Sequence, residues 1–218
     1  MHELLLPLFP LELVLFPSEV LPLHIFEDRY KEMIGGCLEK ADLAPAEAEF
    51  GVVCTEEGKL HTVGCTARIT KVLKRYDDGR LDIATRGERR FEILLTNEEK
   101  PYLRGAVAFF EDDDPKPASG GDVKHSLQLF GEVLRRLRIS AEQAGLKGEF
   151  AQPSFQIAAT LPLGLDFKQE VLAMRNERER LRRLVELMEK LIPALDLRER
   201  ARAKASGNGH VQRSKDSK

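Results

Sequence analysis

The chain has 218 residues, which at about 150 residues per domain indicates one large domain or two small ones. It carries 34 Lys and Arg against 36 Asp and Glu, a net charge of −2. This balance argues against the broad positive surface that non-specific DNA binding requires. Hydrophobic residues make up 42% and charged residues 32% of the chain, which excludes a disordered or fibrous protein.

The cysteines and the N-terminal segment indicate a reducing compartment. Cys37, Cys54 and Cys65 cannot all pair within one chain and have no C-x-x-C spacing, so we expect buried free thiols. Met1–Glu3 lacks the positive residues of a signal peptide, and Pro7 interrupts the apolar run that follows. No apolar run reaches the roughly 18 residues of a transmembrane helix. We therefore expect a cytoplasmic protein with no membrane partner.

The first half of the chain has the alternating pattern of β-strands. Apolar and polar residues alternate over Val63–Lys71 and again over Leu81–Thr85, on either side of the turn signal Asp77-Asp78-Gly79, which predicts a long hairpin. Further strands are predicted at Glu49–Thr55, Phe91–Leu95 and Tyr102–Phe110.

One helix is predicted among these strands. Asp28 is a plausible N-cap, and apolar residues from Tyr30 to Leu38 recur at helical spacing. One face of this helix must therefore pack on the sheet.

The composition changes abruptly after the last strand. Residues 111–121 are rich in acid, proline and glycine, which predicts an exposed linker at 114–121. We accordingly divide the chain into a β-rich domain (1–113), this linker, a helical subdomain (122–199) and a disordered basic tail (200–218). The acidic run Asp112–Asp114 lacks the ligand spacing of a calcium loop, so we interpret it as solvated.

Helical periodicity replaces the alternation beyond the linker. Helices are predicted at 123–137, at 153–161, after a capping box formed by Asp166 and Gln169, and after a second one formed by Asn176 and Glu179. Pro193 lies within the apolar stripe of the last helix and is expected to kink or interrupt it.

The sequence contains no recognisable catalytic motif. It has neither a P-loop nor a G-x-S-x-G nucleophile motif. The five histidines are scattered singly without metal-ligand spacing, and we interpret His24 as a structural hydrogen-bonding residue. The arginines between Arg175 and Arg183 alternate with glutamates, as on a solvated, salt-paired face. We expect no enzyme activity, no catalytic residues, no metal and no cofactor.

The opening of the chain resembles a known family. The resemblance begins with Leu6-Pro7-Leu8-Phe9-Pro10-Leu11-Glu12-Leu13-Val14-Leu15-Phe16-Pro17, Val20-Leu21-Pro22-Leu23-His24-Ile25-Phe26-Glu27 and Arg29-Tyr30. It continues in order with Phe50-Gly51-Val52-Val53, Val63-Gly64-Cys65-Thr66-Ala67-Arg68-Ile69, Asp78-Gly79-Arg80-Leu81, Gly87-Glu88-Arg89-Arg90-Phe91 and Pro101-Tyr102-Leu103. This pattern is similar to that of the N-terminal, substrate-binding domain of Lon proteases, and a looser likeness extends through the helical half.

The resemblance implies an α+β fold: a small twisted, PUA-like β-barrel-like N-terminal domain with one packed helix, followed by a C-terminal helical bundle. Lon proteases continue into an ATPase module and a Ser-Lys protease domain, whereas this chain stops before either, so we expect a stand-alone member without the hydrolytic activity. Relatives usually have glycine after the Phe16-Pro17 pair, but this chain has Ser18, which calls into question the backbone angle of that turn.

The implied function is non-enzymatic binding of unfolded or tagged polypeptides, as an adaptor or holdase in protein quality control, with a protease or chaperone as possible partner. The alternative is a nucleic-acid-binding protein that uses the β-barrel domain and the basic tail, although the charge balance disfavours nucleic acid.

Two groups of apolar residues are candidates for the binding surface. Leu11, Leu13, Val14 and Phe16 lie between prolines, where they either form an exposed apolar loop or plug the open end of the barrel. Phe109 and Phe110 are neighbours on a strand and point to opposite faces, so we expect one in the core and the other outside it. A cleft between the two domains is the remaining alternative.

Overall fold

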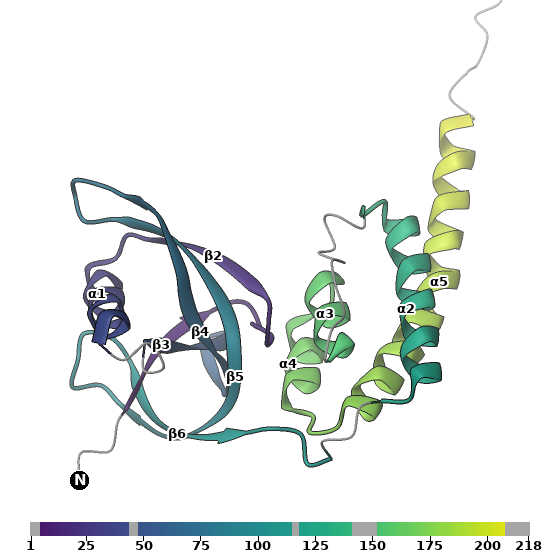
Figure 1. Ribbon diagram of the computed structural model, residues 1–218. Coiled ribbons are helices and arrows are strands. Elements are labelled where there is room, and N and C mark those ends of the chain that lie inside the picture. The colour runs from purple at the N-terminus through teal and green to yellow at the C-terminus, as the bar shows by residue number, and fades with distance from the viewer. Residues whose placement is uncertain (1–4, 44–47, 115–117, 141–151, 208–218) are drawn as a thin grey trace, which may run out of the picture. The chain divides into compact units, whose positions relative to one another are not determined.

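The computed structural model describes residues 5–43, 48–114, 118–140 and 152–207 (Figure 1). The chain folds into two compact units. The first contains residues 1–117 and 150–180, and the second contains 118–149 and 181–218. The first boundary lies close to the expected linker, but two of the helices assigned to the helical subdomain belong to the β-rich unit.

Six strands and five helices follow one another in the described residues. The strands are β1 (Leu6–Leu11), β2 (Val20–Ile25), β3 (Glu49–Glu56), β4 (Lys59–Arg75), β5 (Leu81–Asn97) and β6 (Arg104–Phe110). The helices are α1 (Asp28–Leu43), α2 (Gly120–Leu137), α3 (Pro153–Thr160), α4 (Leu165–Ala173) and α5 (Glu177–Gly207). The fold is therefore α+β, as expected from the sequence.

Five strands of the first unit close into a ring. They follow the order β5, β4, β3, β1 and β6, and β6 pairs back onto β5, while β2 lies against the first half of β5. Only β1 and β3 run parallel among these pairs. The predicted hairpin is confirmed as β4 and β5, with Gly79 at φ 83° in the turn, a conformation that glycine adopts without strain.

The interior of the ring is filled by side chains from all sides. Leu8, Val53 and Phe91 form its buried cluster. The Phe91 ring occupies space that the facing strands leave open with glycine, since an added Cβ would lie 2.6 Å from its Cζ at Gly51 and 2.5 Å at Gly64. Large side chains thus fit beside small ones inside this barrel.

Helix α1 packs on the outside of the ring, as its amphipathic pattern predicted (Figure 1). Its buried side chains include Tyr30, Met33, Ile34 and Cys37. The Tyr30 ring lies 4.1 Å from that of Phe9 on β1, measured between centroids. This contact fixes the helix against the first strand.

Helices α3 and α4 also belong to the barrel unit. The Phe155 ring of α3 stacks on Phe16 with centroids 5.7 Å apart. Gln169 of α4 donates from Nε2 to the Val63 carbonyl oxygen of β4 at 2.7 Å. The predicted capping box of Asp166 and Gln169 is therefore wrong: the N-cap is Gly164, and the amide of Gln169 bonds to the sheet.

The second unit pairs α2 with the longer part of α5, which lie side by side in Figure 1. Ser119 caps α2 by accepting from the Asp122 amide, and Phe130 and Met188 are among the buried residues. An ion pair from Arg136 Nε to Asp196 Oδ1, 2.7 Å long, joins the two helices.

Helix α5 differs from its prediction in two respects. It continues past Pro193 to Gly207, so of the expected kink or interruption the interruption is wrong. The expectation of a disordered tail is also wrong for residues 200–207. The rest of the predicted tail, 208–218, lies outside the described residues. The predicted cap at its start is confirmed, because the Glu179 amide donates to Asn176 Oδ1 at 3.2 Å. None of the described helices combines the length and apolar character needed to cross a bilayer.

Candidate functional site

The loop between β1 and β2 does not present the expected apolar surface. Val14 and Phe16 are buried, whereas Leu11 and Leu13 are half-buried. Phe16 is covered because α3 packs its Phe155 ring on it. Of the two alternatives, the loop is packed rather than exposed. Val14 and Phe16 are therefore not accessible to a partner.

The two phenylalanines of β6 lie in surroundings that differ from the expectation. Phe109 is 45% exposed, and the Arg89 guanidinium lies 3.9 Å from its ring centroid. Phe110 is half-buried between Arg90, at 4.7 Å, and Arg175, at 4.4 Å. Neither ring is fully buried, in contrast to the expectation of one in the core. A guanidinium group lies over each ring, and Phe109 also meets the buried Phe91 ring, with centroids 6.5 Å apart.

A buried network of charged residues links the end of β6 to α3, α4 and α5. Arg180, which is fully buried, bonds Asp112 with both terminal nitrogens at 2.6 Å. It also contacts Glu177 Oε2 at 2.7 Å, and Arg90 reaches Asp112 Oδ1 at 2.6 Å. The interpretations of Asp112 as part of a solvated run and of Arg180 as part of a solvated face are thus wrong.

The charges of this network compensate one another. Burial raises the pKa of Asp112, but hydrogen bonds and charge from Arg180, and then Arg90, outweigh that effect and hold the pKa below its usual value. Ser154 is held within the same network, because its hydroxyl donates to Glu177 Oε2 and accepts from Arg180 Nε at 2.9 Å. Ser154, Glu177 and Arg180 are all buried, so a substrate cannot reach the hydroxyl, and we assign the network a structural role.

Among the described residues of the barrel unit, two of the three most exposed apolar side chains lie on the second half of β5. Leu94 is 61% and Leu95 72% exposed. The register shifts between Ile93 and Leu95, so Leu94 is a bulge residue, and Leu95 lies opposite Ala106 of β6. Paired residues share a face of the sheet. Phe91 pairs with Phe109 and Leu95 with Ala106, and these two partners point to opposite faces of β6. Leu95 therefore lies on the outside of the ring, away from Phe91.

This segment also has an unpaired strand edge. Among the described residues, β6 pairs with one edge of Ile93–Asn97, and no strand pairs with the other, because β4 reaches only Glu92 and β2 only Arg86. We call Ile93–Asn97 the leucine edge. It combines free backbone donors and acceptors with large apolar side chains, the two features that bind an extended polypeptide.

Two other strand edges have no neighbouring strand in the described part of the chain, and they carry residues that discourage pairing. Pro22, near the middle of β2, removes a backbone donor, and Lys71, Lys74 and Arg75 charge the far end of β4. The leucine edge contains neither proline nor charge. It is therefore the better candidate for a binding surface.

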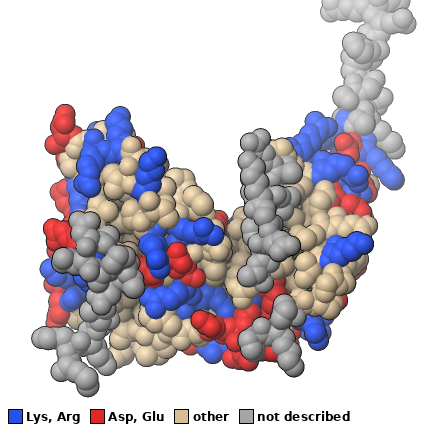
Figure 2. Space-filling model, viewed as in Figure 1, with Lys and Arg blue, Asp and Glu red and all other residues tan. Residues whose placement is uncertain are grey.

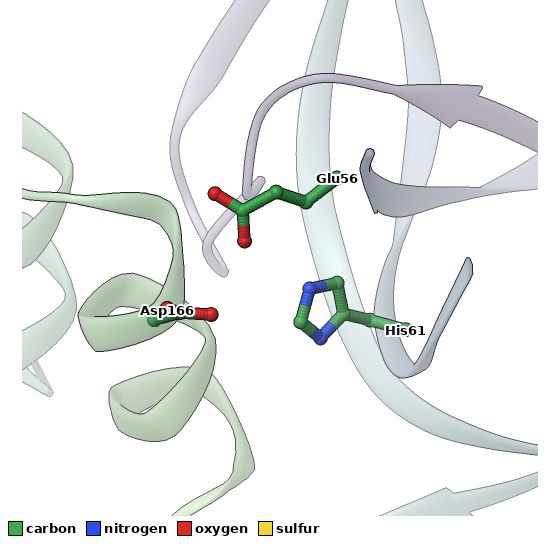
Figure 3. Close-up of side chains that lie close together, drawn as sticks. All are labelled: Glu56, His61 and Asp166. Atoms are coloured by element: carbon green, nitrogen blue, oxygen red, sulfur yellow. The ribbon is translucent and has the colours of Figure 1, made fainter. Parts of the chain in front are cut away.

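A second cluster of functional interest comprises Glu56, His61 and Asp166 (Figure 3). One ligand atom from each residue lies within 4.8 Å of the others. Glu56 ends β3, His61 lies near the start of β4, and Asp166 belongs to the first turn of α4. The side chains point toward one another from three elements, and one imidazole nitrogen with two carboxylates is a donor set that can hold a metal ion.

The surroundings of this cluster are negative. The pKa of Glu56 is raised, first by desolvation and then by the neighbouring Asp166 carboxylate, while His61 acts in the opposite direction. The pKa of the buried Cys54 thiol is also raised, again by desolvation first and then by the carboxylates of Glu56, Asp166 and Glu12.

His24 is part of a hydrogen-bonded surface group with Asp82 and Tyr76. Its Nδ1 lies 2.5 Å from Asp82 Oδ1, and the Tyr76 hydroxyl donates to Asp82 Oδ2 at 2.8 Å. These bonds, His24 first, hold the pKa of Asp82 below its usual value. The interpretation of His24 as a hydrogen-bonding residue is consistent with this geometry.

The surface charges do not form a broad field of one sign on the face drawn in Figure 2. Basic and acidic side chains are interspersed among uncharged ones. The pattern agrees with the near-neutral composition and offers no obvious track for a nucleic-acid backbone on this face.

Comparison with known proteins identifies the family. The model of the ATP-dependent protease La (Lon) substrate-binding domain matches residues 5–190. A solved structure of a Lon N-terminal domain protein from Xanthomonas campestris has a TM-score of 0.64 at 25% identity and covers 84% of this chain and 97% of that one. The N-terminal domain of a Mycobacterium avium complex Lon protease has a TM-score of 0.59 at 18% identity, covering 85% and 98%.

Curated relatives are whole Lon proteases. Lon protease 2 of Herpetosiphon aurantiacus is 29% identical over 200 residues, which are 88% of this chain and 24% of that protein. The Lon protease of Buchnera aphidicola is 26% identical over 90% of this chain and 26% of its own length. The chain thus spans about a quarter of these relatives. A closed β-ring with a packed helix and C-terminal helices defines a Lon N-terminal-type domain, and this chain belongs to the Lon substrate-binding domain family.

Proposed function

We propose that the protein is a non-enzymatic polypeptide-binding module and that it binds extended, unfolded segments at the leucine edge. The observation that carries the proposal is the coincidence of Leu94 and Leu95, both exposed, with a strand edge that has no partner among the described residues. An added strand would gain main-chain hydrogen bonds along this edge and bury the leucines.

Membership of the family also supports a binding function, since the family model is that of a substrate-binding domain. In the cell, such a module would act as an adaptor or holdase in protein quality control, with a protease or chaperone as its partner. Binding by strand addition reads backbone rather than sequence, which suits the recognition of many unrelated unfolded chains.

The first test measures the affinity for a fluorescent, reduced and alkylated unfolded protein by anisotropy. The variant carries Leu94→Ser and Leu95→Ser, and Val20→Ser is the matched control because Val20 is 66% exposed on the proline-containing strand. Burying one leucine contributes about 1.5–3 kcal/mol, so the double variant should weaken binding by at least about tenfold. The control should bind like the wild type.

A second arm tests strand addition itself. Apolar peptides that carry N-methyl groups at alternate residues lose the donors that such pairing needs, and they should bind more weakly than the unmodified peptides. Equal affinity of the double variant and the wild type, at equal thermal stability, would exclude the leucine edge. Phe109→Ser then tests the exposed residue among the candidates predicted from the sequence.

Nucleic-acid binding receives less support from the described surface. Its signature is an affinity for RNA that falls steeply with added salt. The same anisotropy assay with a single-stranded RNA at low salt distinguishes the two functions, and we expect no binding.

A further inference from the structure

The cluster of Glu56, His61 and Asp166 has no evident role in the packing of the barrel. Glu56 and His61 are half-buried, and Asp166 is exposed, so none of the three fills the core. Their polar ends meet in one shared space between the β3–β4 turn and α4 (Figure 3). The cluster is therefore a candidate for binding through its polar atoms.

The local backbone directs His61 toward this space. The turn before it is tight, with Glu57 at φ 50° and Gly58 at φ 77°. Thr55 pairs with Leu60 but Val53 with Gly64, so β4 has extra residues over this stretch. A bulge of this kind turns a side chain out of the regular alternation, and His61 lies within it.

Helix α4 is held in register with the bulge. The bond from Gln169 Nε2 to the Val63 carbonyl, 2.7 Å long, lies two residues along the strand from His61. Asp166 precedes Gln169 by almost one helical turn and so shares its face of the helix. The carboxylate of Asp166 is thereby held opposite the imidazole before any ligand arrives.

The charge of the cluster is uncompensated. No ion pair found among the described residues joins a lysine or arginine to Glu56 or Asp166, although such pairs occur elsewhere on the same barrel, as between Arg68 and Glu49. Glu57 adds a further negative charge close to Glu56. Two neighbouring carboxylates with an imidazole beside them favour a bound cation.

We propose that Glu56, His61 and Asp166 bind one divalent transition-metal ion, with Zn²⁺ as the representative ion. Ligand atoms about 2.0–2.2 Å from zinc lie roughly 3.3–3.6 Å apart in a tetrahedron. The present separations, within 4.8 Å, need only side-chain rotation to reach that geometry. Water would complete the coordination. The imidazole favours a transition metal over Mg²⁺ or Ca²⁺, which prefer oxygen ligands alone.

The metal would join the β3–β4 turn to α4 and so clamp the α3–α4 pair to the barrel. The expectation of no metal rested on spacing along the chain, and Asp166 is far from Glu56 and His61 in the sequence. This proposal does not depend on polypeptide binding at the leucine edge.

Isothermal titration of the metal-stripped full chain with Zn²⁺ tests the site. We expect one ion per chain. Loss of even an outer-shell partner of a metal ligand costs about 10–100-fold in affinity, so His61→Ala should weaken binding by at least about tenfold. Glu56→Gln and Asp166→Asn should each weaken it as well. His125→Ala is the matched control, because His125 is an exposed histidine 3.9 Å from a single glutamate, Glu189.

Two further measurements keep the test decisive. Far-UV circular dichroism establishes that each variant is folded, and Asp166→Asn, at an exposed position, should fold even if His61→Ala does not. The visible spectrum of bound Co²⁺ should show nitrogen and oxygen ligation in the wild type and should change in both variants. No binding at about 100 μM Zn²⁺, or binding that His61→Ala and Asp166→Asn leave unchanged, would overturn the proposal.

Discussion

Single residues set the shape of the barrel interior. Gly64 shows how little space the packing leaves for an added side chain. A Cβ at this position would lie 2.5 Å from Phe91 Cζ and 2.6 Å from the Val52 carbonyl oxygen. The aromatic ring is enclosed and the carbonyl belongs to the neighbouring strand, so neither can move aside cheaply.

Gly64→Ala should therefore destabilise the protein by about 1–3 kcal/mol, the usual cost of overpacking. Gly36→Ala is the control, because no atom lies within 4 Å of its added Cβ and the residue is in helix α1. That substitution should be neutral or stabilising by up to about 1 kcal/mol. Urea unfolding at neutral pH measures both, and equal effects would contradict the packing argument.

Ser18 carries backbone strain where the resemblance implies a glycine in relatives. Its φ is 67°, in the left-handed region. Ser18→Gly should remove a cost of about 1–2 kcal/mol, partly offset by the greater freedom that glycine has in the unfolded chain, about 0.5–1 kcal/mol. We expect a small rise in melting temperature, measured by calorimetry. A fall would mean that the serine side chain stabilises the turn.

Between elements, Asp112 joins the start of α5 to β5, and Arg90 in turn donates to the Leu172 carbonyl oxygen at the end of α4. Asp112 receives bonds from Arg180 and Arg90 in a buried position. Asp112→Asn would leave two buried guanidinium groups short of one negative charge, and breaking such a network costs about 3–5 kcal/mol. Chemical denaturation at pH 7 measures the loss. Asp113→Asn is the control, because the Asp113 side chain is largely exposed. This substitution should change the stability by less than about 0.5 kcal/mol.

The same residue gives stability a dependence on pH. The folded-state pKa of Asp112 lies below its usual value, which in the unfolded chain is about 3.9. Its contribution is thus complete above the unfolded pKa and is lost as the pH falls through the lower folded pKa. The stability difference between wild type and Asp112→Asn should shrink in that acidic range. A difference that stays constant down to acid unfolding would contradict the assignment.

The sequence predicted those elements whose pattern is local. Alternation and the turn at Gly79 predicted the β4–β5 hairpin, and apolar periodicity predicted α1 and α2. Contacts between residues that are distant in sequence could not be predicted from local patterns. Arg180 alternates with glutamates as a solvated arginine does, and only the fold brings it to Asp112.

The candidate sites were missed for the same reason. Leu94-Leu95 breaks the alternation that begins at Phe91, and this break is a signal of a bulge that could have been found. Its exposure, however, depends on where β4 and β2 stop pairing. The proposed metal ligands come from three elements, of which α4 is distant in sequence from β3 and β4, so no spacing rule could detect them.

For the whole molecule, the division into two units predicts separable stability. Phe130 is buried in α2 of the second unit. Phe130→Ala should cost about 3–5 kcal/mol locally. Hydrogen exchange should accelerate in α2 and in α5 beyond Leu181, while the protection of β4 and β5 is retained. Uniform acceleration across the barrel strands would mean that the two units unfold as one.

The short length of the leucine edge determines how long a bound polypeptide would stay. Only every second residue of a strand directs its backbone groups to a given side, so Ile93–Asn97 offers few positions for pairing. A complex held by so few contacts, with a dissociation constant of about 10 μM and an association rate of about 10⁶ M⁻¹s⁻¹, would last roughly a tenth of a second. Such a module would bind and release unfolded chains repeatedly without consuming energy. Longer binding would require several copies bound to the same chain.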